Sequence, residues 1–151
     1  GIYRYGCTEV SRCLCLKVKN VELSFSTSKD FEILDITDEV SKAVKHTEVK
    51  EGLCLVYSLH TTTALVINER EPGLLDDLHQ ASNKLFPKGA GWRHDLIDTN
   101  AHAHLASTFM GNFQVIPITN GSLLLGTWQR LLLVELDGPR RRRVIVTAIG
   151  E

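Results

Sequence analysis

The sequence predicts a single α+β domain, in which two or three helices pack on antiparallel sheet. Short apolar, β-branched runs bounded by turn residues predict the strands, capped amphipathic stretches predict the helices, and no linker, repeat or low-complexity tract divides the chain. The 151 residues are 43% apolar and 23% charged. A domain of this size buries roughly 70% of the surface that its unfolded chain exposes. We therefore expect residues 1–151 to form one domain.

The first part of the chain predicts two strands followed by a helix. Residues 12–26 and 31–34 are rich in Val, Leu, Phe and Ile and flank a turn-forming segment. A helix is expected to begin at Thr37, whose hydroxyl can cap the first amides, and to end near His46. A histidine at a helix C-terminus interacts favourably with the helix dipole, so we assign His46 no ligand role.

The middle of the chain predicts two more strands and two more helices. Residues 53–57 and 63–67 form short apolar runs typical of strands. A helix from Pro72 to Pro87 is expected to bury a leucine face comprising Leu74, Leu75, Leu78 and Leu85. A third helix is expected over residues 101–110. Its predicted N-cap is Asn100, and the residue predicted to stop it in the left-handed conformation is Gly111.

The last third of the sequence predicts only strands. Asn120 and Gly121 favour a tight type I′ hairpin. Pro117 has no amide hydrogen for a strand ladder, so its strand is expected at an edge or with a bulge. The expected strands cover residues 113–118, 122–125, 130–136 and 141–149.

Charge, apolar content and cysteine usage limit the function. The net charge of −1 provides no general field for nucleic acid or an anionic membrane, and no apolar segment approaches a membrane span. No C-x-x-C pair is present, so the cysteines are expected to be buried, reduced thiols. We expect a soluble, cytoplasmic protein that binds neither nucleic acid nor membrane. The cysteines are Cys7, Cys13, Cys15 and Cys54.

Three histidines provide candidate ligands for a metal. His60 lies between two expected strands, His94 lies in an irregular polar segment, and His104 lies in the third expected helix. Three imidazoles favour Zn²⁺ or another borderline metal with an open fourth position. His102 is two residues from His104, about 200° away on a helix, so both cannot face the same ion. The alternative is that each histidine has only a structural role in the fold and binds no metal.

Several sequence elements together resemble the YjbQ-like family. The resemblance runs in order over nearly the whole chain, and its most specific elements are the His-Thr-Thr and Gly-Thr-Trp-Gln sequences. The elements are His60-Thr61-Thr62-Thr63-Ala64-Leu65, Asn68-Glu69, His94 with Asn100 and His104, Pro117-Ile118-Thr119-Asn120-Gly121, Gly126-Thr127-Trp128-Gln129, Asp137-Gly138-Pro139-Arg140 and Gly150-Glu151.

This resemblance implies a β-sandwich-like or barrel-like α+β core, a homotrimer and histidines gathered in one pocket. The family is also named secondary thiamine-phosphate synthase, for a weak transferase activity that joins a pyrimidine diphosphate to a thiazole phosphate. A phosphorylated metabolite is then the expected small-molecule partner. Phosphorylated substrates usually bind with Mg²⁺, so Mg²⁺ is the alternative to Zn²⁺.

We therefore expect a divalent metal at His60, His94 and His104, oriented by acceptors such as Asp98 or Asn100. Glu69 is the candidate general acid or base, and Asp98 is grouped with it as a catalytic carboxylate. A phosphate is expected to contact a hydroxyl, an amide and a guanidinium. These anion-binding candidates are Thr127, Gln129 and Arg140.

Each group of candidate site residues also has an alternative, non-catalytic role. Glu69 could pair with an arginine, and Thr127 and Gln129 could support only the local backbone. Residues 140–143 are four arginines that alternate between two faces in a strand; they could bind an anion or form a solvated basic edge. Three functional classes remain: an enzyme, a protein that binds a metal and a phosphometabolite without turnover, and a structural oligomer.

Overall fold

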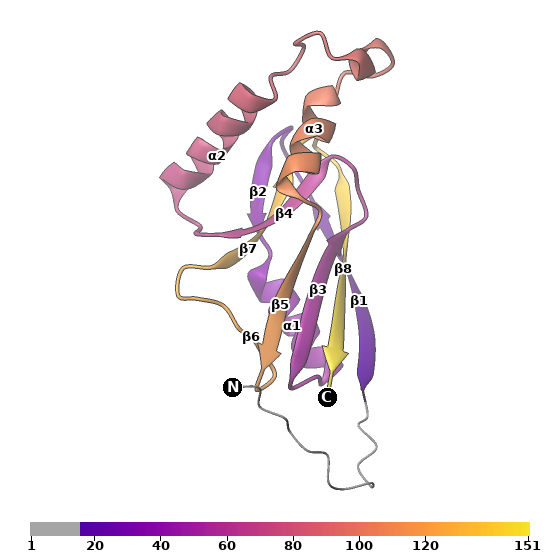
Figure 1. The fold of residues 1–151 in the computed structure, drawn as a ribbon, viewed down its shortest axis with the longest axis vertical. Coiled ribbons are helices and arrows are strands. Elements are labelled where there is room, and N and C mark those ends of the chain that lie inside the picture. Colours follow the sequence, from indigo (N-terminus) through magenta and orange to yellow (C-terminus); the bar gives the residue numbers. More distant parts are fainter. Residues whose placement is uncertain (1–15) are drawn as a thin grey trace, which may run out of the picture.

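The computed structural model describes residues 16–151. The start of the strand expected at residue 12 and the predictions for Cys7, Cys13 and Cys15 lie outside these residues. The described chain is α+β, with two antiparallel sheets and three α-helices (Figure 1). The elements are β1 (Lys17–Ser26), β2 (Glu32–Asp35), α1 (Thr37–Thr47), β3 (Gly52–Ser58), β4 (Thr63–Asn68), α2 (Pro72–Leu85), a 3₁₀ turn η1 (Arg93–Leu96), α3 (Ala101–Met110), β5 (Phe113–Thr119), β6 (Ser122–Leu123), β7 (Arg130–Glu135) and β8 (Arg141–Gly150).

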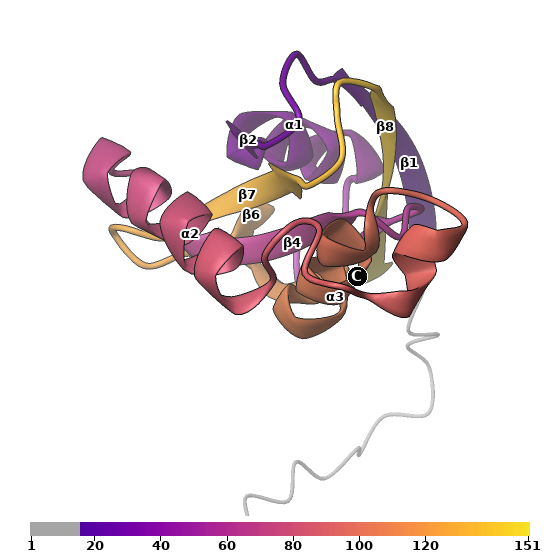
Figure 2. The ribbon, with the colours of Figure 1, turned by 90° about the horizontal axis from the view of Figure 1, so that it is seen from above.

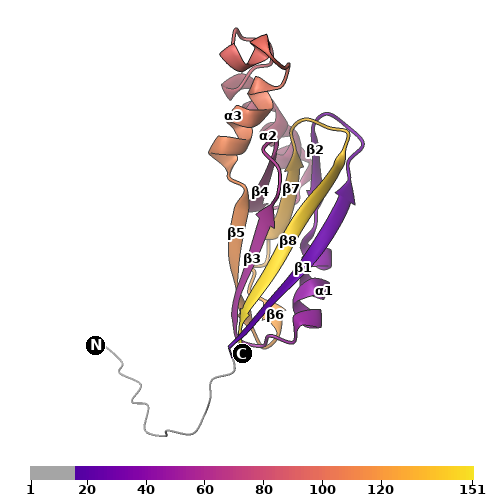
Figure 3. The same ribbon diagram turned by 90° about the vertical axis from the view of Figure 1, so that its right-hand side faces the viewer.

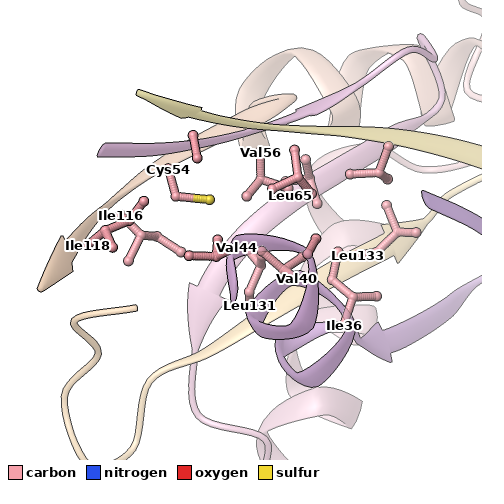
Figure 4. Close-up of a cluster of buried hydrophobic side chains, with 14 of the residues drawn as sticks. Ile36, Val40, Val44, Cys54, Val56, Leu65, Ile116, Ile118, Leu131 and Leu133 are labelled. Atoms are coloured by element: carbon pink, nitrogen blue, oxygen red, sulfur yellow. The ribbon is translucent and has the colours of Figure 1, made fainter. Parts of the chain in front are cut away.

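The two sheets pack against each other around the main core. The five-stranded sheet has the order β1-β8-β3-β5-β6 and the three-stranded sheet has the order β2-β7-β4. Helix α1 contributes Val40 and Val44 to the same core, where they meet Leu131 and Leu133 of β7 (Figure 4). The sandwich-like architecture expected from the sequence is confirmed.

The opposite face of the three-stranded sheet carries helix α3. Ala103 and Ala106 of α3 pack on Ala64 of β4 and on Val134 of β7. Figure 2 shows α3 beside β4, with α2 further out along the same side. Small alanine side chains allow the helix to approach the strand closely, and this packing fixes the position of His104.

The predicted hairpin after β5 is present. Asn120 and Gly121 have φ values of 51° and 76°, as the two central residues of a type I′ turn require. Pro117 lies on β5 opposite Leu53 of β3, and only the two-residue β6 lies beyond it. Its missing amide hydrogen therefore falls near the edge of the sheet, as expected.

Three details of the helices differ from the sequence predictions. Thr37 does not cap α1; its hydroxyl donates to Asp35 Oδ1 at 2.6 Å, because Asp35 lies directly before the helix. Asn100 is the N-cap residue of α3, but its side chain makes no cap hydrogen bond and is used elsewhere. Gly111 ends α3 with φ 95° and ψ 153°, outside the left-handed helical conformation that we expected.

Helix α2 is much more exposed than predicted. Of its residues only Ser82 is buried, and Leu85 is 69% exposed. Figure 1 shows that α2 projects beyond the sheets. An apolar face was therefore predicted correctly, but within residues 16–151 it is only partly covered.

The arginine run does not form the solvated edge that was one of the two alternatives for it. Strand β8 lies between β1 and β3, inside the five-stranded sheet (Figure 3). Arg141 and Arg143 are exposed, whereas Arg142 is 2% exposed and points into the protein. Strand alternation explains the pattern, because neighbouring side chains point to opposite faces.

Candidate functional site

The His94 and His104 side chains meet near the N-terminal end of α3. Their ring centroids are 4.7 Å apart and their planes are 76° apart, an edge-to-face contact. His94 comes from the η1 turn and His104 from the second turn of α3. Asp95 accepts a hydrogen bond from the Ala101 amide at 3.0 Å, so η1 is attached to the start of the helix.

A chain of hydrogen bonds orients the His94 ring. Arg140 Nη2 lies 3.0 Å from Asp137 Oδ2, and Asn100 Nδ2 donates to the same oxygen at 2.8 Å. The ionised carboxylate can only accept, so the amide nitrogen of Asn100 must face Asp137 and its oxygen must face His94. His94 Nε2 lies 3.1 Å from that oxygen. In the neutral ring, therefore, Nε2 carries the hydrogen and Nδ1 carries the free lone pair.

His60 lies in the joint between β3 and β4, as expected, and its ring is already hydrogen-bonded. Its Nε2 accepts from the Arg143 amide at 2.7 Å. Burial and the nearby Arg142 guanidinium lower the pKa of His60 below its usual value of 6.5, partly offset by Glu135. Because Nε2 accepts this hydrogen bond, its lone pair is engaged, and in the neutral ring the hydrogen is on Nδ1.

His60 and His104 line one cavity of about 340 Å³, together with hydroxyl and amide groups. His94 and His104 line a second cavity of about 400 Å³, beside Arg93 and Trp92. His104 therefore belongs to both cavities. The remaining lining residues of the first cavity are Thr61, Ser107, Thr108, Gly111 and Asn112.

The histidines do not form a three-ligand cluster in this conformation. Within residues 16–151, no three His, Cys, Asp or Glu side chains are grouped as metal ligands would be. The chemistry of the donors fits a metal in part, because no group of residues 16–151 hydrogen-bonds to His94 Nδ1 and the His104 ring lies against the His94 ring. His60 would have to release the Arg143 amide to join them.

Glu69 lies away from the histidines. It lines a separate cavity of about 350 Å³ with Thr127, Trp128 and Arg130, and this cavity shares no residue with the histidine cavities. The six residues of β4 separate Glu69 from the His60 joint, and a strand of that length spans roughly 20 Å. The expectation that Glu69 acts at the histidines is therefore not met within one chain.

The other predicted site residues are also dispersed. Gln129 Oε1 accepts from the Gly126 amide at 2.8 Å, the local backbone role considered as an alternative. Arg140 pairs with Asp137, and Asp98 Oδ1 accepts from the Thr99 amide at 2.7 Å. Thr127 lines the Glu69 cavity, whose lining includes neither Gln129 nor Arg140.

Sequence reasoning missed a buried polar network beside His60. Arg142 pairs with Glu135, and Arg142 Nη2 also donates to Thr62 Oγ1 at 2.9 Å. Thr27 Oγ1 donates to Glu135 Oε2 at 2.8 Å. The alternation of the arginine run indicated that some guanidinium groups turn inward, but not which carboxylate they meet.

His102, two residues from His104 on α3, is half-buried. Its Nδ1 atom is buried and has no hydrogen-bond partner within residues 16–151. Burial and Lys88 lower the pKa of His102, partly offset by Asp137, Asp95 and Asp30.

Among the helices of the described residues, none combines the length and apolar character needed to cross a membrane.

Two packed antiparallel sheets with a histidine pair at one helix define a small α+β protein with a polar cavity. The sequence pattern of the family described as UPF0047 protein YjbQ-like matches residues 21–151. The chain belongs to this family.

Relatives and solved structures support the same assignment. A UPF0047 protein of Archaeoglobus fulgidus is 55% identical over 129 residues, which cover 85% of this chain and 100% of that protein. UPF0047 protein YugU of Bacillus subtilis is 35% identical over 132 residues, covering 85% and 97% of the two chains. A structure described as a YbjQ-like protein of unknown function from Sulfolobus solfataricus superposes with a TM-score of 0.88 at 44% identity, covering 90% of this chain and 99% of that one.

Proposed function

We propose that the protein binds a divalent metal, with Zn²⁺ preferred, through His94 and His104, and uses the adjacent cavities to hold a small phosphorylated metabolite. The free His94 Nδ1 lone pair, fixed by the Asn100 and Asp137 hydrogen bonds, carries this proposal. Metal-ligating histidines commonly have their second ring nitrogen held in this way. His60 is the third ligand if its ring turns away from Arg143.

Arg93 is the anion-binding group best placed for this role. It lines the cavity that also contains His94 and His104. Guanidinium groups bind phosphate through charge-assisted, two-point hydrogen bonds. Arg140 acts less directly in this proposal, because its contact with Asp137 supports the orientation of Asn100.

The candidate reaction is the transfer suggested by the family resemblance. The thiazole nitrogen would form a bond to the pyrimidine methylene carbon while the carbon–oxygen bond breaks and diphosphate leaves with the electron pair. Imidazole and guanidinium groups of the two cavities would orient the phosphates, and a bound metal would neutralise part of their charge. A second candidate, binding without turnover, rests on the absence of a carboxylate general base from the lining of both histidine cavities.

We further propose that the functional form is a homotrimer. Strands β3, β5 and β8 lie side by side in the five-stranded sheet (Figure 3), and they carry exposed apolar side chains. Tyr57 pairs with Phe113 in register, and Leu53 pairs with Ile149. Exposed apolar patches of this kind commonly form subunit contacts.

Glu69 and Thr127 retain a role only if a second copy places their cavity against the histidines of the first. Mixed subunits test this arrangement: His104→Ala and Glu69→Gln chains would each be inactive alone and regain part of the activity after mixing. If each variant is inactive and no mixture regains activity, Glu69 and His104 do not act in a shared site between copies.

Metal binding is tested first, with protein purified without an affinity tag and without chelators. Titration with Zn²⁺ should give saturable binding to the wild type and at least tenfold weaker binding to His104→Ala, as expected when one ligand is lost. His46→Ala is the matched control, because His46 is exposed at the far end of α1. Equal binding by all three proteins would reject the histidine site.

Catalysis is tested by measuring thiamine phosphate formed from the two phosphorylated substrates. Wild type should be faster than His60→Ala and His104→Ala, while His46→Ala should match the wild type. Metal binding without any wild-type turnover would favour the non-catalytic candidate. Equal rates for all four proteins would remove the histidine-centred enzyme.

A further inference from the structure

A separate apolar cavity lies beneath helix α2. It is lined by the outward face of the three-stranded sheet, by Leu78 of α2 and by Met110 at the end of α3, and its volume is about 160 Å³. The cavity shares no residue with either histidine cavity. The other lining residues are Phe31, Ile33, Val66, Asn68 and Val134.

The size and lining of this cavity indicate the class of ligand. Six of the seven lining side chains are apolar and carry no charge. For comparison of size, an enclosed apolar cavity of about 150 Å³ takes up a benzene-sized molecule. A single six-membered ring therefore fills the available space without requiring the sheet to move.

Asn68 provides one polar contact at the rim. Its Oδ1 accepts from the Glu69 amide at 2.8 Å. Its amide nitrogen has no hydrogen-bond acceptor in the part of the chain that the structure describes, and so remains available to a ligand oxygen or nitrogen. A ring with one hydrogen-bond acceptor matches both the apolar lining and this donor.

Helix α2 forms the cover of the cavity. Most of the helix is exposed, so little packing holds it in place. One specific contact is the stack of His79 on Phe31, with ring centroids 4.0 Å apart and an interplanar angle of 7°. Outward movement of α2 would withdraw Leu78 from the cavity and admit a ligand without disturbing the main core.

We propose that this cavity is a binding site for a small, uncharged aromatic molecule with one hydrogen-bond acceptor, covered by α2. The site is independent of the metal and phosphate site proposed above. Helix α3 is common to both, because it contributes Met110 here and His104 there.

Met110 allows a direct test, because it is the only methionine in the sequence. Protein labelled with ¹³C at the methionine methyl group should give one signal, which is followed during titration with toluene and with benzyl alcohol. We expect saturable shifts with dissociation constants of roughly 1 mM, as ligands of seven or eight heavy atoms allow. Benzyl alcohol should bind more tightly than toluene, and Asn68→Leu should remove that difference.

Filling the cavity provides the decisive comparison. Val66→Phe should fill the cavity and weaken ligand binding at least tenfold. If this strand variant folds poorly, Leu78→Trp fills the same cavity from helix α2 and should weaken binding in the same way. Leu124→Phe is the matched control, because Leu124 is an exposed apolar residue outside the cavity. Circular dichroism would confirm that each variant is folded.

Three results would overturn the proposal. The first is a methyl signal that does not shift up to the solubility limit of either ligand. The second is unchanged affinity in a folded Val66→Phe or Leu78→Trp variant. The third is a methyl signal that shifts with protein concentration but not with ligand, which would show that a second copy of the chain occupies the cavity.

Discussion

Arg142 of β8 and Glu135 of β7 form a two-point ion pair that joins the two sheets. Arg142 Nε donates to Glu135 Oε2 at 2.7 Å and Nη2 donates to Oε1, with both side chains almost fully buried. Thr27 and the Asp137 amide bond the same carboxylate. Both carboxylate oxygens of Glu135 and the Nε and Nη2 atoms of Arg142 are therefore hydrogen-bonded, and the pair helps to fix the strand whose Arg143 amide holds His60.

Removing one charge from this pair should destabilise the fold strongly. Glu135→Gln leaves the Arg142 guanidinium buried without its counter-ion, so we expect the free energy of unfolding to fall by about 3 kcal/mol. Urea denaturation measures this change. The matched control is Glu22→Gln, whose partner Arg143 is solvent-exposed, and a surface pair contributes about 0–1 kcal/mol. Similar losses in the two variants would contradict the assigned role.

The same pair predicts a loss of stability in acid. Burial acts to raise the pKa of Glu135, but hydrogen bonds from Arg142, the Asp137 amide and Thr27 outweigh it and hold the pKa below the usual 4.5. The unfolded chain thus takes up the proton at higher pH than the folded chain. This stabilisation is complete above pH 4.5 and is lost as the pH falls through the folded value. Melting temperatures measured from pH 7 to pH 3 should fall less steeply for Glu135→Gln than for wild type. Parallel profiles would contradict this prediction.

Gly138 should not tolerate a side chain. A Cβ atom there would lie 2.2 Å from the Lys29 carbonyl oxygen, 2.8 Å from Glu135 Cγ and 2.9 Å from Thr27 Oγ1. Gly138→Ala must therefore displace backbone next to the buried pair, and we expect about 1–3 kcal/mol lower stability in thermal or urea unfolding. Gly126→Ala is the control, since its nearest contact would be Gln129 Oε1 at 3.4 Å. A stable Gly138→Ala protein beside a destabilised Gly126→Ala protein would reverse the expected order.

The sequence predicted those parts of the fold that depend on local signals. The Asn120-Gly121 turn follows from the backbone preferences of two residues, and each strand from its own composition. The exposure of α2 was not predictable in the same way. Amphipathic spacing identifies an apolar face, but the surface that covers it depends on distant residues such as Phe31 and Val66.

The candidate site shows the same limit. His94 and Asn100 are six residues apart and were correctly grouped, because they belong to one irregular segment. Glu69 was grouped with His60 through sequence proximity, but the intervening strand carries it to another cavity. Glu135 was missed altogether, since its partner depends on pairing between strands rather than on neighbouring residues. The metal site itself stays a prediction.

The orientation of His94 provides a test of the site that does not require any metal. Because Asn100 presents its oxygen to His94 Nε2, ¹⁵N NMR of the neutral ring should show the hydrogen on Nε2 and a bare Nδ1. Asn100→Ala removes the acceptor, so the two tautomers should become mixed and Zn²⁺ affinity should fall about 10–100-fold. Asn83→Ala on the exposed part of α2 is the matched control and should leave the His94 spectrum unchanged. A wild-type ring with its hydrogen on Nδ1 would mean that Asn100 faces His94 with its amide nitrogen, and His94 Nδ1 would then be unable to bind a cation in this conformation.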